Sequence, residues 1–435
     1  MKRYGLLLLA VVLLLLAGCS QQVQTSQVKP KAPADVTTIN WYYFPVFAPR
    51  TTDAGSYEQT AIQKFQAAHP GIKVNPVPVN FETGPDKLEY ALEKGLCDVI
   101  LDAPGRIVAY GRAGKMLTLN KLFDEQLRQD PGNKMVLEAC GVNERMYLYP
   151  LSTSPFYMAF NKQMLEASGK ANLVREGWTR EDFVQVLEAL HQSGFVPGTI
   201  FCYGQGGDQA TRALVSNLYG GSVIAPDLQS YTLNQPQGME ALTFIQEAVT
   251  KGLLLNGSLL TGTDDLENFA SGRSAFTILW SGAQQSAYQT QLSGRGIQVI
   301  EVPFPAPGGQ PKLEYLVNGF AAVRSGDDAR ETASLAFIKF MCDDPDMGRS
   351  NVIQTGGIPV RAAFKNVHAD ARMLKIASWT KYYAPYYNNV AGFSRMRVYW
   401  YQMLQSLLRL TKTPEAAAHD FTLLADQTLK AKPAF

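Results

Sequence analysis

The chain has 435 residues, of which 46% are hydrophobic and 18% are charged. This composition excludes a disordered chain or a collagen-like fibre and predicts a folded body of two or three domains. There are 40 lysines and arginines against 38 aspartates and glutamates. Without Lys2 and Arg3 the count is 38 against 38, and no long basic run follows. The body lacks the electrostatic footprint of a nucleic-acid binder, so we expect no nucleic-acid partner.

The N-terminus predicts an export signal over residues 1–18. Two basic residues precede the apolar run 6–17, which is long enough for a signal peptide but shorter than the ~20 residues that span a bilayer. The run ends in Leu-Ala-Gly-Cys19, which resembles the lipobox of bacterial lipoproteins, where cleavage leaves a lipidated cysteine. The alternative is an ordinary signal with a chance cysteine. No later apolar run reaches 18 residues, so we expect a lipid anchor, not a span, and an extracytoplasmic body.

Residues 19–36 are polar, contain two prolines and have no apolar period, which is typical of a flexible tether. The four cysteines beyond Cys19 show no C-x-x-C spacing, and we expect buried thiols. One disulfide is the alternative, because an extracytoplasmic compartment permits it. These cysteines are Cys97, Cys140, Cys202 and Cys342.

The first part of the body reads as a βαβ unit with a buried parallel sheet. The pattern predicts a strand over 37–44, a helix over 56–68 that His69-Pro70-Gly71 stops, and an extended edge segment over 72–79 that contains two prolines. A helix is predicted after Pro85, and a short apolar strand over 97–101.

The same alternation continues to the C-terminus, without an internal repeat. Apolar periodicity predicts helices over 179–193, 237–251, 330–342, 398–410 and 414–430, and strands over 274–279 and 316–323. The fold class is therefore α/β, and a body of ~400 residues exceeds what one core usually supports, so two lobes are expected. A ligand would lie at the carboxyl ends of the strands or between the lobes.

The sequence carries no enzyme signature. The four histidines (His69, His191, His368 and His419) are far apart, and there is neither a G-x-S-x-G elbow nor a phosphate-binding loop. Ser378 to Lys381 fits S-x-x-K, but its companion motifs are absent. The adjacent aspartate pairs 264–265 and 327–328 precede predicted helices and are explained as helix caps. We therefore expect no catalytic residue, metal or cofactor.

Aromatic residues are crowded near the C-terminus, with nine in the 23 residues 379–401. A second cluster, Trp41 to Phe44, ends the first predicted strand. Aromatic faces stack on the C–H faces of sugars, so the density favours a polar ligand with flat apolar faces. The alternative for each single residue is ordinary core packing.

Several segments resemble one family in the same order along the chain. They include IQKFQAAHPGIKV, LCDVILDAPGRIVAYGRAGKMLTLNKLF, YPLSTSPFYMAFNKQML, GWTREDF, FASGRSAFTILWSG and the run from LEYLVNGF to TGGIPVRAAF. They are similar to the extracellular solute-binding proteins of bacterial ABC importers, in the maltose, oligosaccharide and glycerol-3-phosphate branch. The resemblance covers residue 37 to the C-terminus.

The resemblance implies a periplasmic-binding-protein-like fold, with two α/β lobes that close on a ligand. Three crossings between the lobes are expected near 151–154, 314–317 and 366–372. Lobe I would comprise 37–152 plus 316–368, and lobe II 153–315 plus 369–430. The partners implied are a small solute and ABC permease subunits, and we expect a monomer.

The resemblance also implies ligand-binding residues at matched positions. They are Trp41, Tyr43, Asp102, Arg106, Ser154, Gly207, Asp208, Trp280, Asn318, Gly319, Arg397 and Tyr399. Many relatives have Pro-Asp-Val before the ligand loop and a Trp or Tyr after the late Asn-Gly, whereas this chain has Cys97-Asp98-Val99 and Phe320. The ligand class is therefore not carried over with the fold.

The leading hypothesis is a lipid-anchored receptor that delivers a sugar or oligosaccharide to an ABC permease. A phosphorylated polyol such as glycerol 3-phosphate is the first alternative, because Arg106, Arg395 and Arg397 could form a phosphate clamp. The second is a lipid-anchored carbohydrate-active enzyme, which needs two carboxylates about 5 to 10 Å apart across a cleft.

Overall fold

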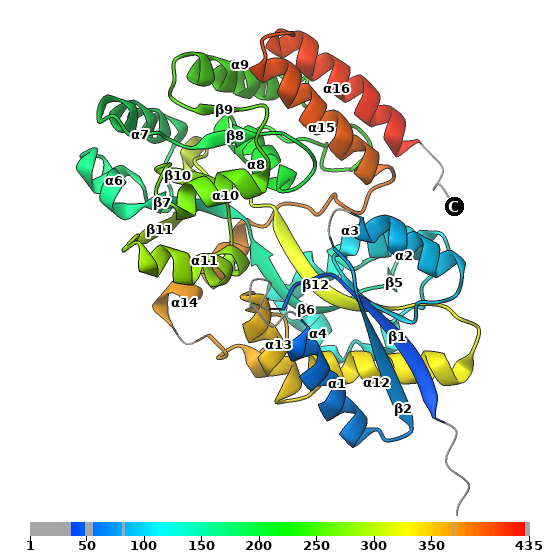
Figure 1. Cartoon of the computed structure of the whole chain (residues 1–435). Helices are drawn as coiled ribbons and strands as arrows, with labels where there is room; N and C mark the ends of the chain where they lie inside the picture. Colours follow the sequence, from blue (N-terminus) through cyan, green and yellow to red (C-terminus); the bar gives the residue numbers. More distant parts are fainter. Residues whose placement is uncertain (1–35, 48–54, 81–82, 369, 431–435) are drawn as a thin grey trace, which may run out of the picture. The chain divides into compact units, whose positions relative to one another are not determined.

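A computed structural model describes residues 36–47, 55–80, 83–368 and 370–430. The expected signal, Cys19 and most of the tether lie outside this part of the chain. From Thr37 onward, the described residues form one compact unit that consists of two α/β lobes (Figure 1). None of the helices within the described ranges is long and apolar enough to cross a membrane.

Lobe I is built on a six-stranded mixed sheet. Strands β1, β2 and β3 are parallel, which confirms the predicted βαβ unit, and β12 joins the same sheet antiparallel to β3. The edge position of β2 suits Pro76 and Pro78, which have no N–H to donate. In sheet order the strands are β13 (Ile358–Pro359), β6 (Tyr149–Pro155), β12 (Tyr315–Ala322), β3 (Val99–Asp102), β1 (Thr37–Tyr43) and β2 (Ile72–Pro78).

Lobe II contains a three-stranded antiparallel sheet of β10 (Phe276–Trp280), β7 (Tyr157–Asn161) and β11 (Val299–Val302), together with the parallel pair β8 (Thr199–Phe201) and β9 (Leu255–Gly257). Strands β8 and β10 begin side by side, because Ala275 donates its N–H to the carbonyls of Val196 and Pro197. They also end near each other. A Cβ added at Gly207 (φ 79°), in the loop that follows β8, would lie 2.6 Å from the side chain of Leu279 in β10 and 3.1 Å from that of Phe201 in β8.

The helices agree closely with the periodicity. Helix α1 (Ser56–Ala68) has the predicted bounds, and α15 begins five residues earlier than predicted. The other long helices are α2 (Gly84–Glu93), α3 (Pro104–Arg112), α7 (Arg180–Gln192), α8 (Asp208–Leu218), α9 (Pro236–Thr250), α10 (Gly262–Ala270), α11 (Gly282–Gly294), α12 (Asp328–Asp343), α13 (Met347–Thr355), α14 (Ala371–Ser378), α15 (Phe393–Leu408) and α16 (Pro414–Leu429). Short helices are α4 (Glu125–Gln129), α5 (Lys134–Ala139) and α6 (Lys162–Ala167), and a hairpin joins β4 (Gly141–Val142) to β5 (Arg145–Met146).

Strands β6 and β12 pair with each other in lobe I, and β6 leads directly into β7 of lobe II. The segment 382–390, which connects α14 to α15, lies along them. Leu313 exchanges two backbone hydrogen bonds with this segment, and Tyr383 stacks on Tyr315 with ring centroids 4.0 Å apart. Arg112 of α3 donates a hydrogen bond to the carbonyl of Asn389. This connecting segment therefore contacts the sheet and helices of lobe I before the chain enters α15.

The cysteines bear out the prediction of buried thiols. Cys97, Cys140, Cys202 and Cys342 are all buried and free. Burial raises the pKa of each thiol, and for Cys202 it reaches about 12. These groups are therefore protonated and unreactive at neutral pH.

Candidate functional site

The lobe I side of the candidate site is an ion pair at the carboxyl end of β3. The Asp102 carboxylate is almost fully buried and accepts two hydrogen bonds from Arg106 of α3, at 2.7 and 2.8 Å. The backbone N–H of Ala103 donates to it as well, at 2.7 Å. The Arg106 guanidinium lies 4.5 Å from the centre of the Phe44 ring. Burial alone would lower the pKa of Arg106, but the Asp102 charge outweighs it and the pKa is raised.

The lobe II side is a second bidentate ion pair at the start of α8. The Asp208 carboxylate accepts hydrogen bonds from Arg397 of α15 at 2.8 and 2.9 Å, and from Arg212 at 2.5 Å. Arg397 also donates to the carbonyl of Gln205, in the loop after β8. Burial would raise the pKa of Asp208, but Arg212 and Arg397 outweigh it and hold the pKa below its usual range. Asp208 is therefore ionised at neutral pH.

Arg212 extends this ion pair to the start of β12. Its side chain is only 1% exposed, and it donates to both carboxylate oxygens of Glu314, at 3.2 and 2.9 Å. It also donates to the Tyr387 hydroxyl, which in turn donates to Glu314. Burial raises the pKa of Glu314 even though Arg212 opposes the rise. We call Asp208, Arg212, Glu314, Tyr387 and Arg397 the Arg212 network; its two guanidinium groups face two carboxyl groups.

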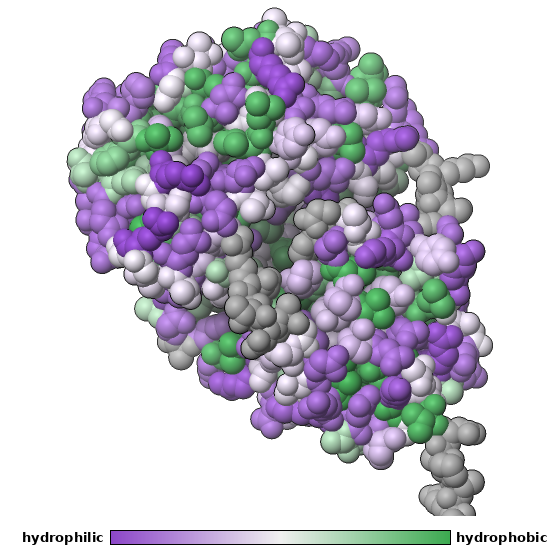
Figure 2. All heavy atoms as spheres, viewed as in Figure 1, coloured by the Kyte–Doolittle hydropathy of each residue, from purple (hydrophilic) through white to green (hydrophobic). Residues whose placement is uncertain are grey.

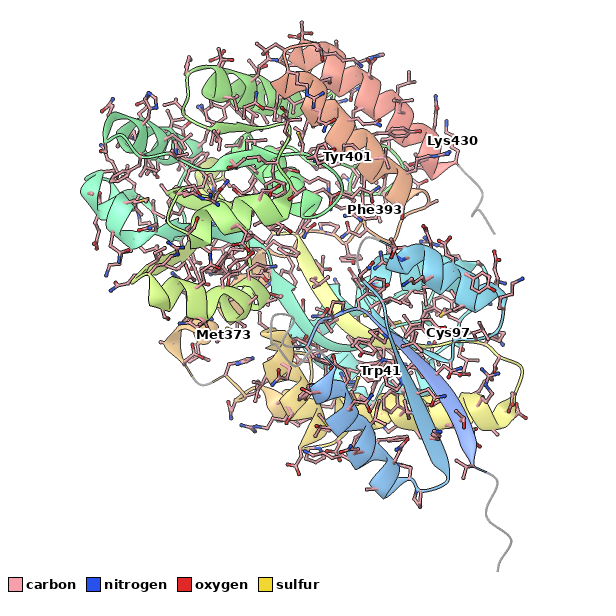
Figure 3. The ribbon with its side chains drawn as sticks, in the orientation of Figure 1. Trp41, Cys97, Met373, Phe393, Tyr401 and Lys430 are labelled. Atoms are coloured by element: carbon pink, nitrogen blue, oxygen red, sulfur yellow. The ribbon has the colours of Figure 1, made fainter. Side chains whose placement is uncertain are left out.

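The segment that carries Tyr386 and Tyr387 connects the two ion pairs. Tyr387 belongs to the Arg212 network, and a Cβ added at Gly105, next to Arg106, would lie 2.7 Å from the carbonyl oxygen of Asn388. Burial raises the pKa of Tyr386, and the charges of Asp102 and Glu314 add to the rise. Figure 2 shows the surface hollowed between the lobes, and Figure 3 places Phe393 at the end of α15 that faces lobe I. The candidate site is this junction, with an ion pair on each side.

The remaining predicted residues are placed differently, and their ligand contacts stay predictions. Trp41 and Trp280 are fully buried: Trp41 packs on Phe337, and the Trp280 indole donates to Glu301 at 3.2 Å. Four more are buried in strands of the lobe I sheet, and two are half-buried in lobe II. The four are Tyr43 in β1, Ser154 in β6, and Asn318 and Gly319 in β12, of which Gly319 pairs with Asp102 of β3. The two are Gly207 and Tyr399.

One exposed aromatic at this edge was not among the predicted residues. Tyr203 is the second residue after β8 and is 56% exposed, and its N–H donates to the carbonyl of Leu260, in the loop after β9. It stands in the same loop as Gln205, the partner of Arg397. Its place after a short apolar strand and before Gly204-Gln205-Gly206-Gly207 is the sequence signal that could have indicated it.

The aromatic crowding is largely core packing. Trp379 and Trp400 are fully buried, and Tyr383 and Tyr387 are nearly so. Tyr382, Tyr386, Phe393, Tyr399 and Tyr401 pack against the same core with part of their surface exposed. The density therefore comes from the segment that runs along β12 and from the buried face of α15.

Two aspartates of the adjacent pairs cap helices, as predicted. Asp264 completes a capping box with Thr261 on α10, and Asp327 caps α12. In the described ranges, no three His, Cys, Asp or Glu side chains are grouped to hold a metal ion.

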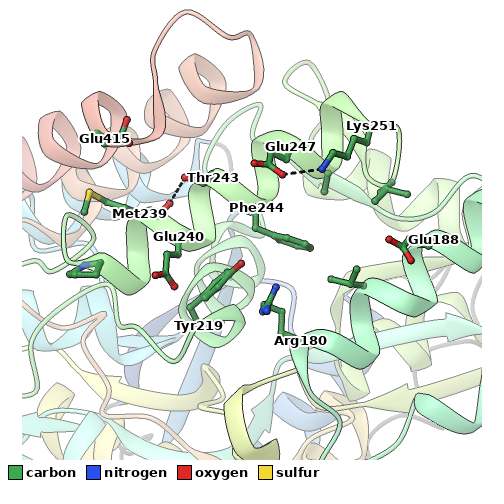
Figure 4. A pocket seen from close by; sticks show the side chains of 14 residues that line it. Arg180, Glu188, Tyr219, Met239, Glu240, Thr243, Phe244, Glu247, Lys251 and Glu415 are labelled. Atoms are coloured by element: carbon green, nitrogen blue, oxygen red, sulfur yellow. Dashed lines mark hydrogen bonds and ion pairs between the residues drawn. The ribbon is translucent and has the colours of Figure 1, made fainter.

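A separate groove lies on lobe II between α7 and α9 (Figure 4). It has a volume of about 730 Å³. Phe244 and Tyr219 line it, and the Arg180 guanidinium lies 4.7 Å from the centre of the Tyr219 ring. Glu247 and Lys251 form an ion pair at its rim. None of the predicted ligand residues lines this groove.

A two-lobed α/β fold with a polar junction between the lobes defines a periplasmic-type solute-binding protein. The family model for bacterial extracellular solute-binding proteins matches residues 48–347, and the chain belongs to this family. A protein of Streptomyces antibioticus described as an uncharacterized lipoprotein in the oleD 5′ region is 25% identical over 353 residues, which cover 79% of this chain and 73% of that protein.

Solved structures agree with the fold. The GacH receptor of Streptomyces glaucescens, described unliganded and in complex with acarbose, aligns with a TM-score of 0.73 at 16% identity, over 91% of this chain and 99% of that one. Lmo0181 of Listeria monocytogenes, in complex with cycloalternan, aligns with 0.72 at 18%, over 92% and 100%. Maltose-bound MalE3 of T. maritima aligns with 0.71 at 18%, over 91% and 99%. The family and these neighbours are binding proteins, and likeness at this identity shows the fold.

Proposed function

We propose that the chain is a solute-binding lipoprotein that captures an uncharged sugar or oligosaccharide at the junction and delivers it to an ABC permease. The observation that carries the proposal is that Arg106 and Arg397 are each held by a carboxylate in bidentate geometry. The site thus offers charged hydrogen-bonding groups without a net charge, which suits the hydroxyls of a neutral ligand. The sugars named for GacH, Lmo0181 and MalE3 support the same class.

A phosphorylated polyol fits this arrangement less well. Two of the three arginines of the supposed clamp, Arg106 and Arg397, already have carboxylate partners. Arg395 is exposed and has no ion-pair partner among the described residues. A phosphate would have to displace Asp102 or Asp208 from a charge-assisted bidentate pair, which costs more than meeting a free guanidinium.

A carbohydrate-active enzyme also fits less well. A glycosidase needs one carboxyl group with a raised pKa to protonate the leaving oxygen. The pKa of Asp208 is instead held low by Arg212 and Arg397. Burial raises the pKa of Glu314, but this side chain is only 10% exposed and both of its oxygens accept hydrogen bonds from Arg212. We therefore propose that neither carboxyl group is catalytic and that the chain is not an enzyme.

The expected lipobox at Cys19 supports attachment on the outer side of a bacterial membrane, as does the lipoprotein from Streptomyces antibioticus. We expect a monomer to capture the ligand by closing its two lobes, because ligand contacts on both sides of the junction favour the closed state. The closed state would then deliver the ligand to the permease.

A thermal-shift and calorimetric screen of residues 37–435 tests the ligand class. Neutral mono- and oligosaccharides are expected to include at least one that raises the Tm, since a ligand present at 100 times its Kd stabilises the folded state by about 2.7 kcal/mol. Glycerol 3-phosphate and inorganic phosphate are expected to leave the Tm unchanged. A panel in which the phosphates stabilise and no neutral sugar does would reverse the proposal.

Tyr203→Ala is expected to weaken binding of the sugar found in that screen by about tenfold, because an exposed ring beside the junction can stack on a sugar face. Tyr90→Ala is the matched control: Tyr90 is 58% exposed and lies near the C-terminal end of α2, which precedes β3, whereas Asp102 ends β3. Calorimetry with both variants decides the role of Tyr203, and equal affinities would remove it from the site.

A further inference from the structure

We propose that Asp208 is the residue that makes this site select uncharged ligands, and that it acts by cancelling the charge of Arg397. The inference rests on the proposed function and names a specificity-determining residue of the same site. The sequence offered Asp208 and Arg397 as ligand contacts, whereas the structure joins them to each other.

The two arginines that bind Asp208 differ in whether they have a second carboxylate partner. Both of its guanidinium partners share oxygen Oδ2, Arg212 at 2.5 Å and Arg397 at 2.8 Å. Arg212 has a second counter-charge in Glu314, at 2.9 Å. Arg397 has no second carboxylate among the described residues, and its other acceptor is the carbonyl of Gln205. Loss of the Asp208 charge would therefore leave Arg212 compensated and Arg397 uncompensated.

Arg397 is also placed where a ligand can meet it. Its side chain is 23% exposed, whereas those of Arg212 and Asp208 are 1% and 3% exposed. Asp208 stands in the first turn of α8, where the helix dipole favours a negative charge. An anionic ligand at this point would have to compete with a carboxylate that the protein already supplies and that two arginines keep ionised.

Lobe I has a similar ion pair between a partly exposed arginine and a buried aspartate, with one difference. Arg106 is 27% exposed and its carboxylate partner Asp102 is 3% exposed, again in bidentate geometry. The guanidinium also rests on the Phe44 ring, which gives it a further favourable contact. Loss of the Asp102 charge would uncover Arg106 in the same way, so Asp102→Asn provides a second, independent test of charge cancellation at the junction.

The test compares the unmodified protein with Asp208→Asn, which keeps the shape and the acceptor oxygen. Inorganic phosphate and glycerol 3-phosphate are titrated by calorimetry at low and at physiological salt. We expect Asp208→Asn to bind phosphate at least tenfold more tightly than the unmodified protein, with a gain that shrinks as salt rises. Asp208→Asn/Arg397→Gln is expected to lose that gain, because the uncovered charge is removed.

Asp420→Asn is the matched control. Asp420 pairs with Lys412 at 2.6 Å on the outer surface of α16 and contacts none of the residues of the junction, so its loss should leave phosphate binding unchanged. A folded Asp208→Asn without the gain, or a gain that persists in the double variant, would overturn the proposal. If Asp208→Asn does not fold, Asp102→Asn with Asp102→Asn/Arg106→Gln decides charge cancellation by the same criteria. Failure of the unmodified protein to bind any neutral sugar would instead count against the proposed function.

Discussion

Replacing Arg212 by methionine is expected to lower the free energy of unfolding by about 3 to 5 kcal/mol. The guanidinium is almost completely buried and holds two carboxyl groups, Asp208 and Glu314. Methionine fills similar space but leaves Glu314 buried with only the Tyr387 hydroxyl to donate to it. Removing one partner of a buried ion pair is costly because the remaining charge stays desolvated.

Urea denaturation at pH 7 measures this loss. Arg180→Met is the control, since Arg180 pairs with Glu181 at the surface, and such pairs contribute about 0 to 1 kcal/mol. The penalty of Arg212→Met should shrink in acid, where Glu314 and then Asp208 become protonated and no longer need a counter-charge. A loss below 1 kcal/mol at pH 7 would mean that the Arg212 network contributes little to the fold.

The sequence predicts the helices and the first strands well because nearby residues in the chain determine where these elements begin and end. Helix α1 ends at Ala68, directly before the predicted stop at His69-Pro70-Gly71. Strand β2 lies at the edge of the sheet, as its prolines require. Helix α15 begins before its apolar period becomes visible, because Gly392 takes a positive φ of 66° and Ser394 and Arg395 of the first turn face solvent. The antiparallel pairing of β12 with β3 joins segments that are far apart in the sequence, so the local pattern of neither strand predicts it.

Half of the candidate site could be inferred from spacing. Asp208 and Arg212 are four residues apart on α8, and such residues meet on one helix face. Asp102 ends β3 four residues before Arg106 of α3, so this pair is also local in the sequence. The partner that gives Asp208 its proposed role is Arg397, 189 residues later in the sequence. Only the folded chain shows that a residue expected to touch the ligand neutralises another one.

The exposure of the aromatic residues could not be inferred from the sequence. The family resemblance implied ligand contacts for Trp41 and Trp280, and both side chains are buried in the lobe cores. Tyr203, two residues after the three-residue strand β8, is exposed. The position of an aromatic residue after a strand indicates the correct edge of the sheet, whereas its exposure depends on packing from distant elements such as α12 and α10, which supply Phe337 and Phe269 to cover the two tryptophans.

Replacing Asp265 by asparagine is expected to stabilise the protein above pH 7, by about 4 kcal/mol at most. Asp265 is fully buried on α10; Thr277 donates to one of its oxygens at 2.5 Å, and no described cation pairs with it. Burial raises the pKa of Asp265 to about 7, although hydrogen bonds from Thr277 and Thr199 oppose the rise. The folded protein therefore favours the neutral carboxyl group, whereas the unfolded chain ionises it near its usual pKa of about 4.

The sign follows from this difference. The contribution of Asp265 to stability is fully present below about pH 4, falls as the pH rises, and is lost above about pH 7, because folding must then keep a proton on the group or bury its charge. A difference of about 3 pH units at about 1.4 kcal/mol each sets the upper limit. Asparagine does not ionise, so the unfolding free energy of Asp265→Asn should lack this decline.

Urea denaturation at intervals between pH 4 and 8 provides the measurement, and the neighbouring aspartate provides the control. Hydrogen bonds from the Thr261 hydroxyl and backbone lower the pKa of Asp264, so its contribution is present at neutral pH and is lost in acid. Asp264→Asn should therefore reduce stability at pH 7, while Asp265→Asn raises it. Parallel pH profiles for Asp265→Asn and the unmodified protein would show that Asp265 ionises normally in the fold. Opposite effects of these adjacent substitutions would instead show that burial raises the pKa of Asp265 while helix capping lowers that of Asp264.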